Sequence, residues 1–289
     1  AYDPSGAAGH RTIVAAVNAD QLGLLRRDLG AGFFEGRYTI GQWFWETESF
    51  PVRFHHAFSW VDEVWAATTH MCDAFTAGAP TGLPVTHMPL PLLAPPVDHT
   101  LSRAALGLTD RFTFLFCFDM FSIIERKNPL AIVNAFRAAF RPNEGPALVI
   151  KTINGGARLA ALEHLRWQCR DRDDITVIDG YLDTATSGAL MAHADCYISL
   201  HRAEGLGLTM AEAMSLGKPV IATAYSGNMD FMTPETALLV PWSPVAVPSG
   251  AEPYDVGSVW ADPDIGVAAS LMQRVVADPE LAARIAAAG

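Results

Sequence analysis

The sequence has no long hydrophobic run. Half of its 289 residues are hydrophobic, but no stretch of about 18 apolar residues occurs, so no membrane-spanning helix is predicted. The first ten residues are small or polar and have no apolar centre like that of a secretory signal. We therefore expect a cytoplasmic protein, and we leave peripheral contact with a membrane open.

Positive charge is scarce. The chain has 20 Lys and Arg against 31 Asp and Glu, a formal net charge of −11. Proteins that bind nucleic acid need a basic face to neutralise phosphates. The composition therefore argues against a nucleic-acid partner, while it allows a local cationic pocket.

Cysteine is also sparse. The four cysteines, Cys72, Cys117, Cys169 and Cys196, are far apart in the sequence and show no spacing typical of a metal site or of a disulfide framework. This pattern favours a reducing compartment. No internal repeat at a fixed period occurs.

What the chain does have is an alternation of short β-branched or aromatic runs with longer Ala- and Leu-rich amphipathic stretches. This alternation predicts an α/β fold with parallel sheets. The expected strands are residues 12–17, 38–43, 63–67, 112–118, 147–151, 175–178, 196–200 and 219–223. The expected helices beyond the first third are residues 129–140, 157–170, 184–194, 210–216 and 265–288.

A Pro-rich passage, residues 84–96, interrupts the alternation and is typical of an interdomain connection. The length fits two domains, and we expect them at residues 1–98 and 99–289. In the second domain, Asn128 and Pro129 suit the N-cap and first position of a helix, because an Asn side chain can accept from helix N–H groups.

Two carboxylates, Glu204 and Glu212, flank a glycine-containing loop that runs into a helix. A helix start has unpaired N–H groups and the positive end of a dipole, which suit a phosphate, whereas carboxylates suit sugar hydroxyls. One site could hold a diphosphate and its two sugar rings. The alternative for Glu212 is a capping box with Thr209, although that explains neither Glu204 nor the turn at Gly205 and Gly207.

Arg126 and Lys127 stand directly ahead of the helix at 129–140. Two cations there could neutralise the charge that grows on a diphosphate leaving group as a glycosidic bond breaks. The alternative is an exposed cation pair balanced by Glu125, which would have little energetic value.

Residues 199–223, which include His201-Arg-Ala-Glu-Gly-Leu-Gly-Leu-Thr-Met-Ala-Glu212, resemble the signature of the group 1 (GT4-like) retaining glycosyltransferases of the GT-B fold. Three further segments, residues 118–129, 150–152 and 225–231, lie along the chain in the order that this family uses. The resemblance extends over residues 104–289 and more faintly over residues 40–46 and 61–65. It implies two Rossmann-like parallel-sheet domains, of which the N-terminal one is incomplete.

The resemblance also implies a role for each matching residue. Glu204 would meet the transferred sugar and Glu212 the ribose, while Lys127 and Arg126 would act on the diphosphate as the bond breaks. The backbone of Leu206, Gly207, Leu208 and Thr209 would complete the diphosphate grip. Lys151 and Tyr181 would lie near the base. Apart from the resemblance, His201 ends an expected strand beside Glu204, so we expect it either to support the site or to contact the donor.

The implied reaction retains the anomeric configuration, through a front-face attack in which the donor phosphate helps to deprotonate the acceptor. The donor would be GDP- or UDP-linked, with mannose as the leading sugar, and the acceptor would be a glycan or a lipid-linked saccharide. No cofactor or metal is implied, and no Asp-x-Asp motif stands where a metal-bound donor would require one. The alternative is an inactive nucleotide-sugar-binding module or fragment, as would follow if the shortened N-terminal domain supplies no wall for the acceptor. Many relatives also carry an upstream arginine where this chain has Asp119, Met120 and Phe121.

Overall fold

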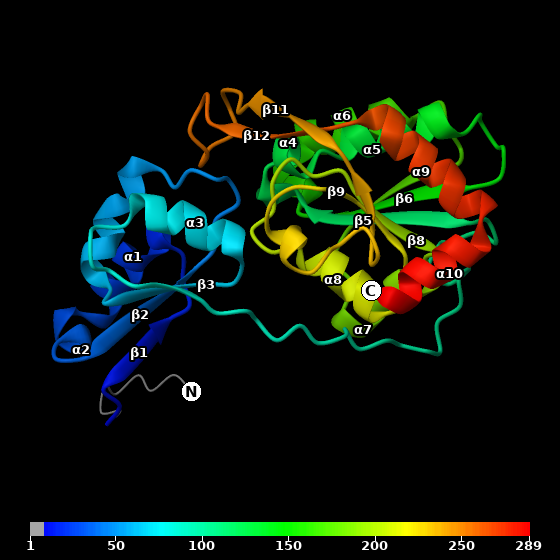
Figure 1. Cartoon of the computed structure of the whole chain (residues 1–289). Helices are drawn as coiled ribbons and strands as arrows, with labels where there is room; N and C mark the ends of the chain where they lie inside the picture. Colours follow the sequence, from blue (N-terminus) through cyan, green and yellow to red (C-terminus); the bar gives the residue numbers. More distant parts are fainter. Residues whose placement is uncertain (1–8) are drawn as a thin grey trace. The chain divides into compact units, whose positions relative to one another are not determined.

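The computed structural model describes residues 9–289 (Figure 1). Most of the N-terminal segment used above to argue against a secretory signal, residues 1–8, lies outside this part. The chain divides into two compact units, of which the first ends at Leu90 and the second is Pro91–Gly289. The division expected between residues 98 and 99 falls inside the second unit, where the Asp98 N–H donates to the Ala185 carbonyl at 3.1 Å.

The first unit contains a four-stranded sheet in the order β1-β2-β3-β4, and every neighbouring pair is parallel. Its core is aromatic: Trp43 is fully buried and contacts the rings of Phe50, Phe58 and Phe75. The elements of this unit are β1 (Thr12–Ala15), α1 (Ala19–Leu29), α2 (Ala31–Phe34), β2 (Tyr38–Trp43), η1 (Val52–Trp60), β3 (Glu63–Ala66), α3 (Thr69–Gly78) and β4 (Val85–His87).

The second unit is built on a six-stranded parallel sheet in the order β10-β9-β8-β5-β6-β7. The central strand β5 is an almost continuous apolar run, as expected of a strand covered on both faces. The strands are β5 (Thr113–Asp119), β6 (Ala147–Ile153), β7 (Ile175–Asp179), β8 (Cys196–Ser199), β9 (Val220–Thr223) and β10 (Leu238–Val240).

Helices cover both faces of this sheet. In the view of Figure 1, α5, α6 and α9 lie above the strands and α7 and α8 lie below them. The helices and 3-10 turns are η2 (Met120–Ser122), α4 (Ile124–Lys127), α5 (Pro129–Ala139), η3 (Gly155–Arg158), α6 (Leu159–Cys169), α7 (Thr184–His193), α8 (Leu208–Ser215), η4 (Gly227–Asp230), α9 (Ile265–Ala277) and α10 (Pro279–Ala288).

The expected α/β fold with parallel sheets is confirmed, and each expected strand is present within two residues of its bounds. Three expectations need correction. The Pro-rich passage contains a short strand, β4. The C-terminal helix is two helices, because Asp278 ends α9 and caps α10 by accepting from the Leu281 N–H. Strand β10 and an antiparallel hairpin, β11 (Trp242–Ala246) with β12 (Val259–Pro263), were not predicted.

The role of Asn128 was also wrong in detail. Asn128 occupies the N-cap position of α5, followed by Pro129, but its side chain caps nothing. The Asn128 side-chain amide donates instead to the Leu200 carbonyl at 2.9 Å, and its backbone is left-handed. A tertiary contact with the end of β8 has therefore replaced the local cap.

Candidate functional site

The candidate site lies at the carboxyl ends of the strands of the second sheet, where ligands of open α/β sheets collect. β5 leads into α4, β8 leads through a short loop into α8, and β9 leads into η4. Because β5, β8 and β9 are neighbours in the sheet, these three connections converge.

Arg126 and Lys127 both bind the Glu204 carboxylate. The guanidinium of Arg126 lies 3.2 Å from Glu204 Oε2, and the ammonium of Lys127 pairs with Oε1. All three side chains are at least 85% buried, with exposed fractions of 5%, 15% and 10%. The interpretation of the two cations as an exposed pair balanced by Glu125 is therefore wrong for Arg126 and Lys127.

The charge of Glu204 is fixed by these neighbours. Burial opposes ionisation, but Lys127 and Arg126 outweigh it and lower the pKa of the Glu204 carboxyl to about 2. The site therefore holds an anion between two cations throughout the physiological pH range.

The loop after β9 supports the Glu204 backbone. The Glu204 N–H donates to Ser226 Oγ at 2.8 Å, and the Gly227 N–H donates to the Glu204 carbonyl at 2.9 Å. A Cβ at Gly227 would lie 1.8 Å from the Gly205 carbonyl oxygen. Only glycine allows this close approach, so residue 227 fixes how the two loops pack.

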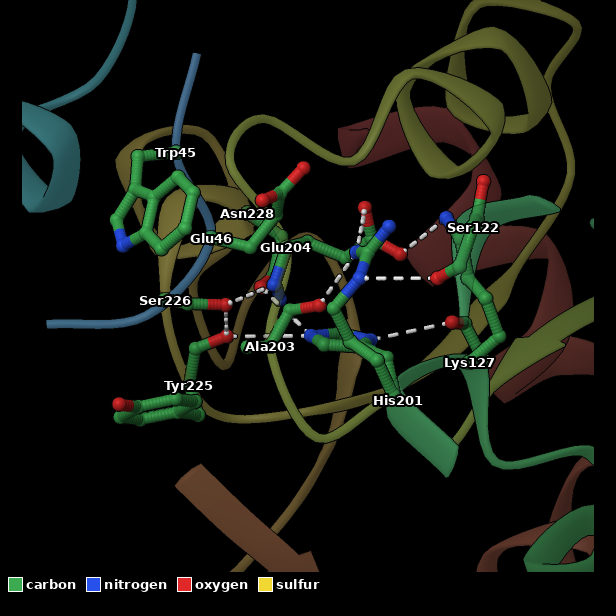
Figure 2. A network of polar contacts seen from close by, with 12 residues as sticks. Trp45, Glu46, Ser122, Lys127, His201, Ala203, Glu204, Tyr225, Ser226 and Asn228 are labelled. Atoms are coloured by element: carbon green, nitrogen blue, oxygen red, sulfur yellow. Dashed lines mark hydrogen bonds and ion pairs between the residues drawn. The ribbon is translucent and has the colours of Figure 1, made fainter. Parts of the chain in front are cut away.

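His201 lies fully buried beneath this arrangement (Figure 2). Its Nδ1 is 3.1 Å from Ser199 Oγ, and its Nε2 is 3.1 Å from Asn228 Oδ1 and 3.2 Å from the Tyr225 carbonyl. Burial lowers the pKa of the imidazole. Both ring nitrogens thus have protein partners, and His201 links the end of β8 to the loop after β9.

Two residues beside the cluster have unusual backbones. Ile123, which precedes α4, has φ 62°, and Ser226 has φ 75° with ψ −150°. The first is rare for a β-branched residue, and the second falls in a region occupied almost only by glycine. Such conformations persist where the surroundings over-determine them, and they gather at functional sites.

The capping-box interpretation of Glu212 is wrong. The N-cap of α8 is Gly207, with φ 89° and no side-chain cap, and Thr209 lies inside the helix. Glu212 is half-buried, its carboxylate makes no hydrogen bond or ion pair with a described residue, and burial raises the pKa of this carboxyl. Leu206 is buried and Leu208 is 52% exposed, so the helix start is reachable from solvent.

Lys151 and Tyr181 belong to a neighbouring group at the ends of β6 and β7. The buried Lys151 ammonium donates to the backbone carbonyls of Thr152, at 2.8 Å, and of Gly180, and burial lowers its pKa. Tyr181 is 74% exposed and its hydroxyl donates to Asn154. Lys151 therefore fixes the loop that presents the Tyr181 ring.

The structure thus brings Arg126, Lys127, Glu204 and His201 together, whereas it places Lys151 and Tyr181 in a second group. The roles of Ser226 and Gly227 were not predicted, although their place directly after an expected strand was a usable signal. Within residues 9–289, no helix is long and apolar enough to cross a membrane. In the same residues, no group of three His, Cys, Asp or Glu is placed to hold a metal ion.

Comparison with known proteins points to one family. The sequence profile of the family described as Glycosyl transferases group 1 matches residues 116–289. A search of the curated proteins found no match.

Among solved structures, HepE of Anabaena in complex with UDP and glucose superposes with a TM-score of 0.71 at 17% identity, over 96% of this chain and 71% of HepE. Sucrose-phosphate synthase from Thermosynechococcus elongatus gives 0.69 at 18%, over 96% and 67%. A glycosyltransferase from Rickettsia africae gives 0.64 at 14%, over 96% and 70%. At these identities the likenesses show the shared GT-B fold.

Proposed function

This chain is a member of the group 1 glycosyl transferases, and from that premise we propose that it transfers a hexose or deoxyhexose from a nucleoside diphosphate sugar to a saccharide, with retention of the anomeric configuration. The observation that carries the proposal is the buried cluster of Lys127, Arg126 and Glu204 at the carboxyl edge of the second sheet. It combines fixed positive charge for a diphosphate with a permanent acceptor for a sugar hydroxyl.

Each part of the donor finds a matching group in this proposal. The diphosphate lies at the start of α8, whose unpaired N–H groups and dipole favour an anion, and within reach of Lys127. Glu204 accepts from a hydroxyl of the transferred sugar. The Glu212 carboxylate lies one turn along α8 and has no hydrogen-bond or ion-pair partner among the described residues, and it accepts from the ribose. The exposed Tyr181 ring lies toward the base.

The bond that breaks joins the anomeric carbon to a phosphate oxygen. As it breaks, negative charge grows on the departing nucleotide. Lys127 and the α8 N-terminus stabilise that charge, and because they are already in place no reorganisation is needed during the reaction. The acceptor hydroxyl oxygen attacks from the same face and forms the new bond, and its proton passes to the departing phosphate oxygen. The positive charge comes from the protein, so we propose that the transfer proceeds without a metal ion.

The donor and the acceptor are proposed at the level of chemical class. GDP-mannose is the donor expected from the sequence, whereas a UDP-linked hexose is favoured by the UDP and glucose held by the HepE structure. Pocket contacts to the base and to sugar hydroxyls decide such choices. The acceptor we propose is a glycan or a lipid-linked saccharide, reached through peripheral membrane contact where it is lipid-linked. Four free cysteines agree with a cytoplasmic setting.

The test is a panel of GDP-mannose, UDP-glucose and related donors, each assayed for release of free nucleotide with and without saccharide acceptors, in buffer with and without EDTA. We expect acceptor-dependent release from one donor, unchanged by EDTA and lost in Lys127→Met. Arg166→Met, which removes an exposed cation of α6, serves as the matched control and should remain active. Nucleotide binding without release from any donor would instead identify an inactive nucleotide-sugar-binding module.

A further inference from the structure

The Glu204 carboxylate is shared by two cations that differ in the geometry of their charged groups and in their exposure. Resting on the donor site proposed above, we propose that Arg126 is a positioning residue that holds Glu204 permanently, whereas the Lys127–Glu204 pair is a resting contact that opens when the donor diphosphate takes Lys127. The diphosphate thereby releases Glu204 Oε1 for the sugar.

Arg126 is anchored on two segments of backbone. Its Nε donates to the Ser122 carbonyl at 3.2 Å, and its Nη1 donates to the Ala203 carbonyl at 2.8 Å and lies 3.2 Å from Glu204 Oε2. A guanidinium is a rigid, planar group with several donors, so one side chain can meet all three acceptors at once. Arg126 therefore ties the turn before α4 to the loop after β8, and it stays in place whether or not a donor is bound.

Lys127 is built for exchange. Its ammonium is a single point charge on a flexible stem, and its side chain is three times as exposed as that of Arg126, 15% against 5%. It can turn from Glu204 Oε1 to a phosphate oxygen without any movement of the backbone. A diphosphate that enters the site must therefore compete with Glu204 for Lys127.

The exchange affects the binding of the free nucleotide and of the sugar-linked donor differently. A nucleoside diphosphate breaks the Lys127–Glu204 pair and leaves Oε1 without a replacement, whereas the sugar-linked donor supplies a hydroxyl that donates to Oε1. Because buried polar groups are costly when unpaired, the complex with the free nucleoside diphosphate is less stable than the complex with the sugar-linked donor. Glu204 thus favours release of the nucleotide after transfer.

The first experiment is a double-mutant cycle measured by calorimetric titration of UDP and of GDP into the wild type, Glu204→Gln, Lys127→Met and the double variant. We expect Glu204→Gln to bind the nucleotide about tenfold more tightly than the wild type, which corresponds to about 1.4 kcal/mol. This gain should disappear in the Lys127→Met background, since no ammonium remains to be released. Glu163→Gln, which removes an exposed carboxylate of α6, should bind like the wild type.

An equal gain in both backgrounds would mean that Glu204 simply repels the phosphates, and it would overturn the exchange while leaving the proposed function standing. Failure of the wild type to bind either nucleotide would overturn the proposed function, and the exchange with it. Circular dichroism of each variant establishes that it is folded before its affinity is compared.

The second experiment tests Arg126 with Arg126→Lys, which keeps the charge but cannot reach three acceptors. We expect the nucleotide affinity to stay within about twofold of the wild type, because the diphosphate is held by Lys127, while kcat falls by about tenfold or more because Glu204 is no longer positioned. A loss of nucleotide affinity as large as that of Lys127→Met would show that Arg126 contacts the diphosphate, and it would overturn its assignment as a positioning residue.

Discussion

Gly227→Ala should damage the site without removing any functional group. The added Cβ would lie 1.8 Å from the Gly205 carbonyl oxygen, 2.4 Å from its carbon and 3.0 Å from the Glu204 carbonyl oxygen. These are backbone atoms, so no side chain can rotate away. The loop that carries Glu204 must retreat from the loop after β9 by roughly 1 Å, as expected for overpacking in a dense interior.

The size of the effect follows from this displacement. Overpacking of this kind costs about 1–3 kcal/mol in the free energy of unfolding, and each kcal/mol lowers Tm by about 2–4 °C in a unit of this size. A reacting group that is misplaced by about 1 Å can cost on the order of 100-fold in rate. We therefore expect a modest fall in Tm together with a large fall in kcat.

The measurement combines thermal unfolding with donor-dependent nucleotide release. Gly156→Ala is the matched control, because a Cβ at Gly156, in the exposed η3 turn, meets no atom within 4 Å. The control should keep its activity and its Tm. If Gly227→Ala behaves like Gly156→Ala in both assays, the close packing of the two loops does not fix Glu204, and the reasoning fails.

Three further predictions concern stability. Asp174→Asn should lower the free energy of unfolding by about 3–5 kcal/mol in urea titrations with nucleotide affinity unchanged, because it breaks the buried Arg172–Asp174 pair at 2.7 Å; a loss below 1 kcal/mol would contradict this. The folded-state pKa of Glu204, about 2 against an ordinary 4.5, lies below its unfolded value, so its stabilisation is complete above pH 4.5 and lost as the pH falls toward 2. The stability difference between wild type and Glu204→Gln should accordingly shrink from pH 5 to pH 3, and a constant difference would refute the pairing. Asn228→Ala leaves the Thr223 carbonyl and the His201 ring without this partner and should cost about 1–3 kcal/mol by thermal unfolding; no change in Tm would show that the network is dispensable.

Five strands of the second sheet, β5 to β9, could be predicted because burial on both faces leaves a plain signal, whereas the three-residue β10 was not predicted. The run that became β5 is apolar at nearly every position, and its bounds differ from the expected ones by one residue. β4 could not be predicted, because its three residues, Val85–His87, follow a proline and carry no period of their own. The hairpin strand β11 is exposed at every position and includes Pro244, so it offers no alternation to detect.

The candidate site was likewise predictable only in part. The approach of Lys127 to Glu204 was predictable in outline, since both follow strands of one parallel sheet. How Arg126 and Lys127 divide the carboxylate was not, because that depends on the single turn of α4 and on the left-handed Ile123 before it. Asn128 shows the same limit. Its position as the N-cap residue of α5 was predicted from local preference, but its side-chain amide donates to a carbonyl 72 positions away in the chain.

Ser226 also says something about how this protein could be altered. Glycine would adopt its backbone conformation more easily, by about 1–3 kcal/mol, yet glycine has no side-chain oxygen to accept from the Glu204 N–H as Ser226 Oγ does. Protein engineering guided by backbone conformational energy would choose Ser226→Gly. A screen for thermostability alone would then select variants with slow turnover. At strained positions of this kind, engineers should keep the native side chain and seek thermal stability at other residues.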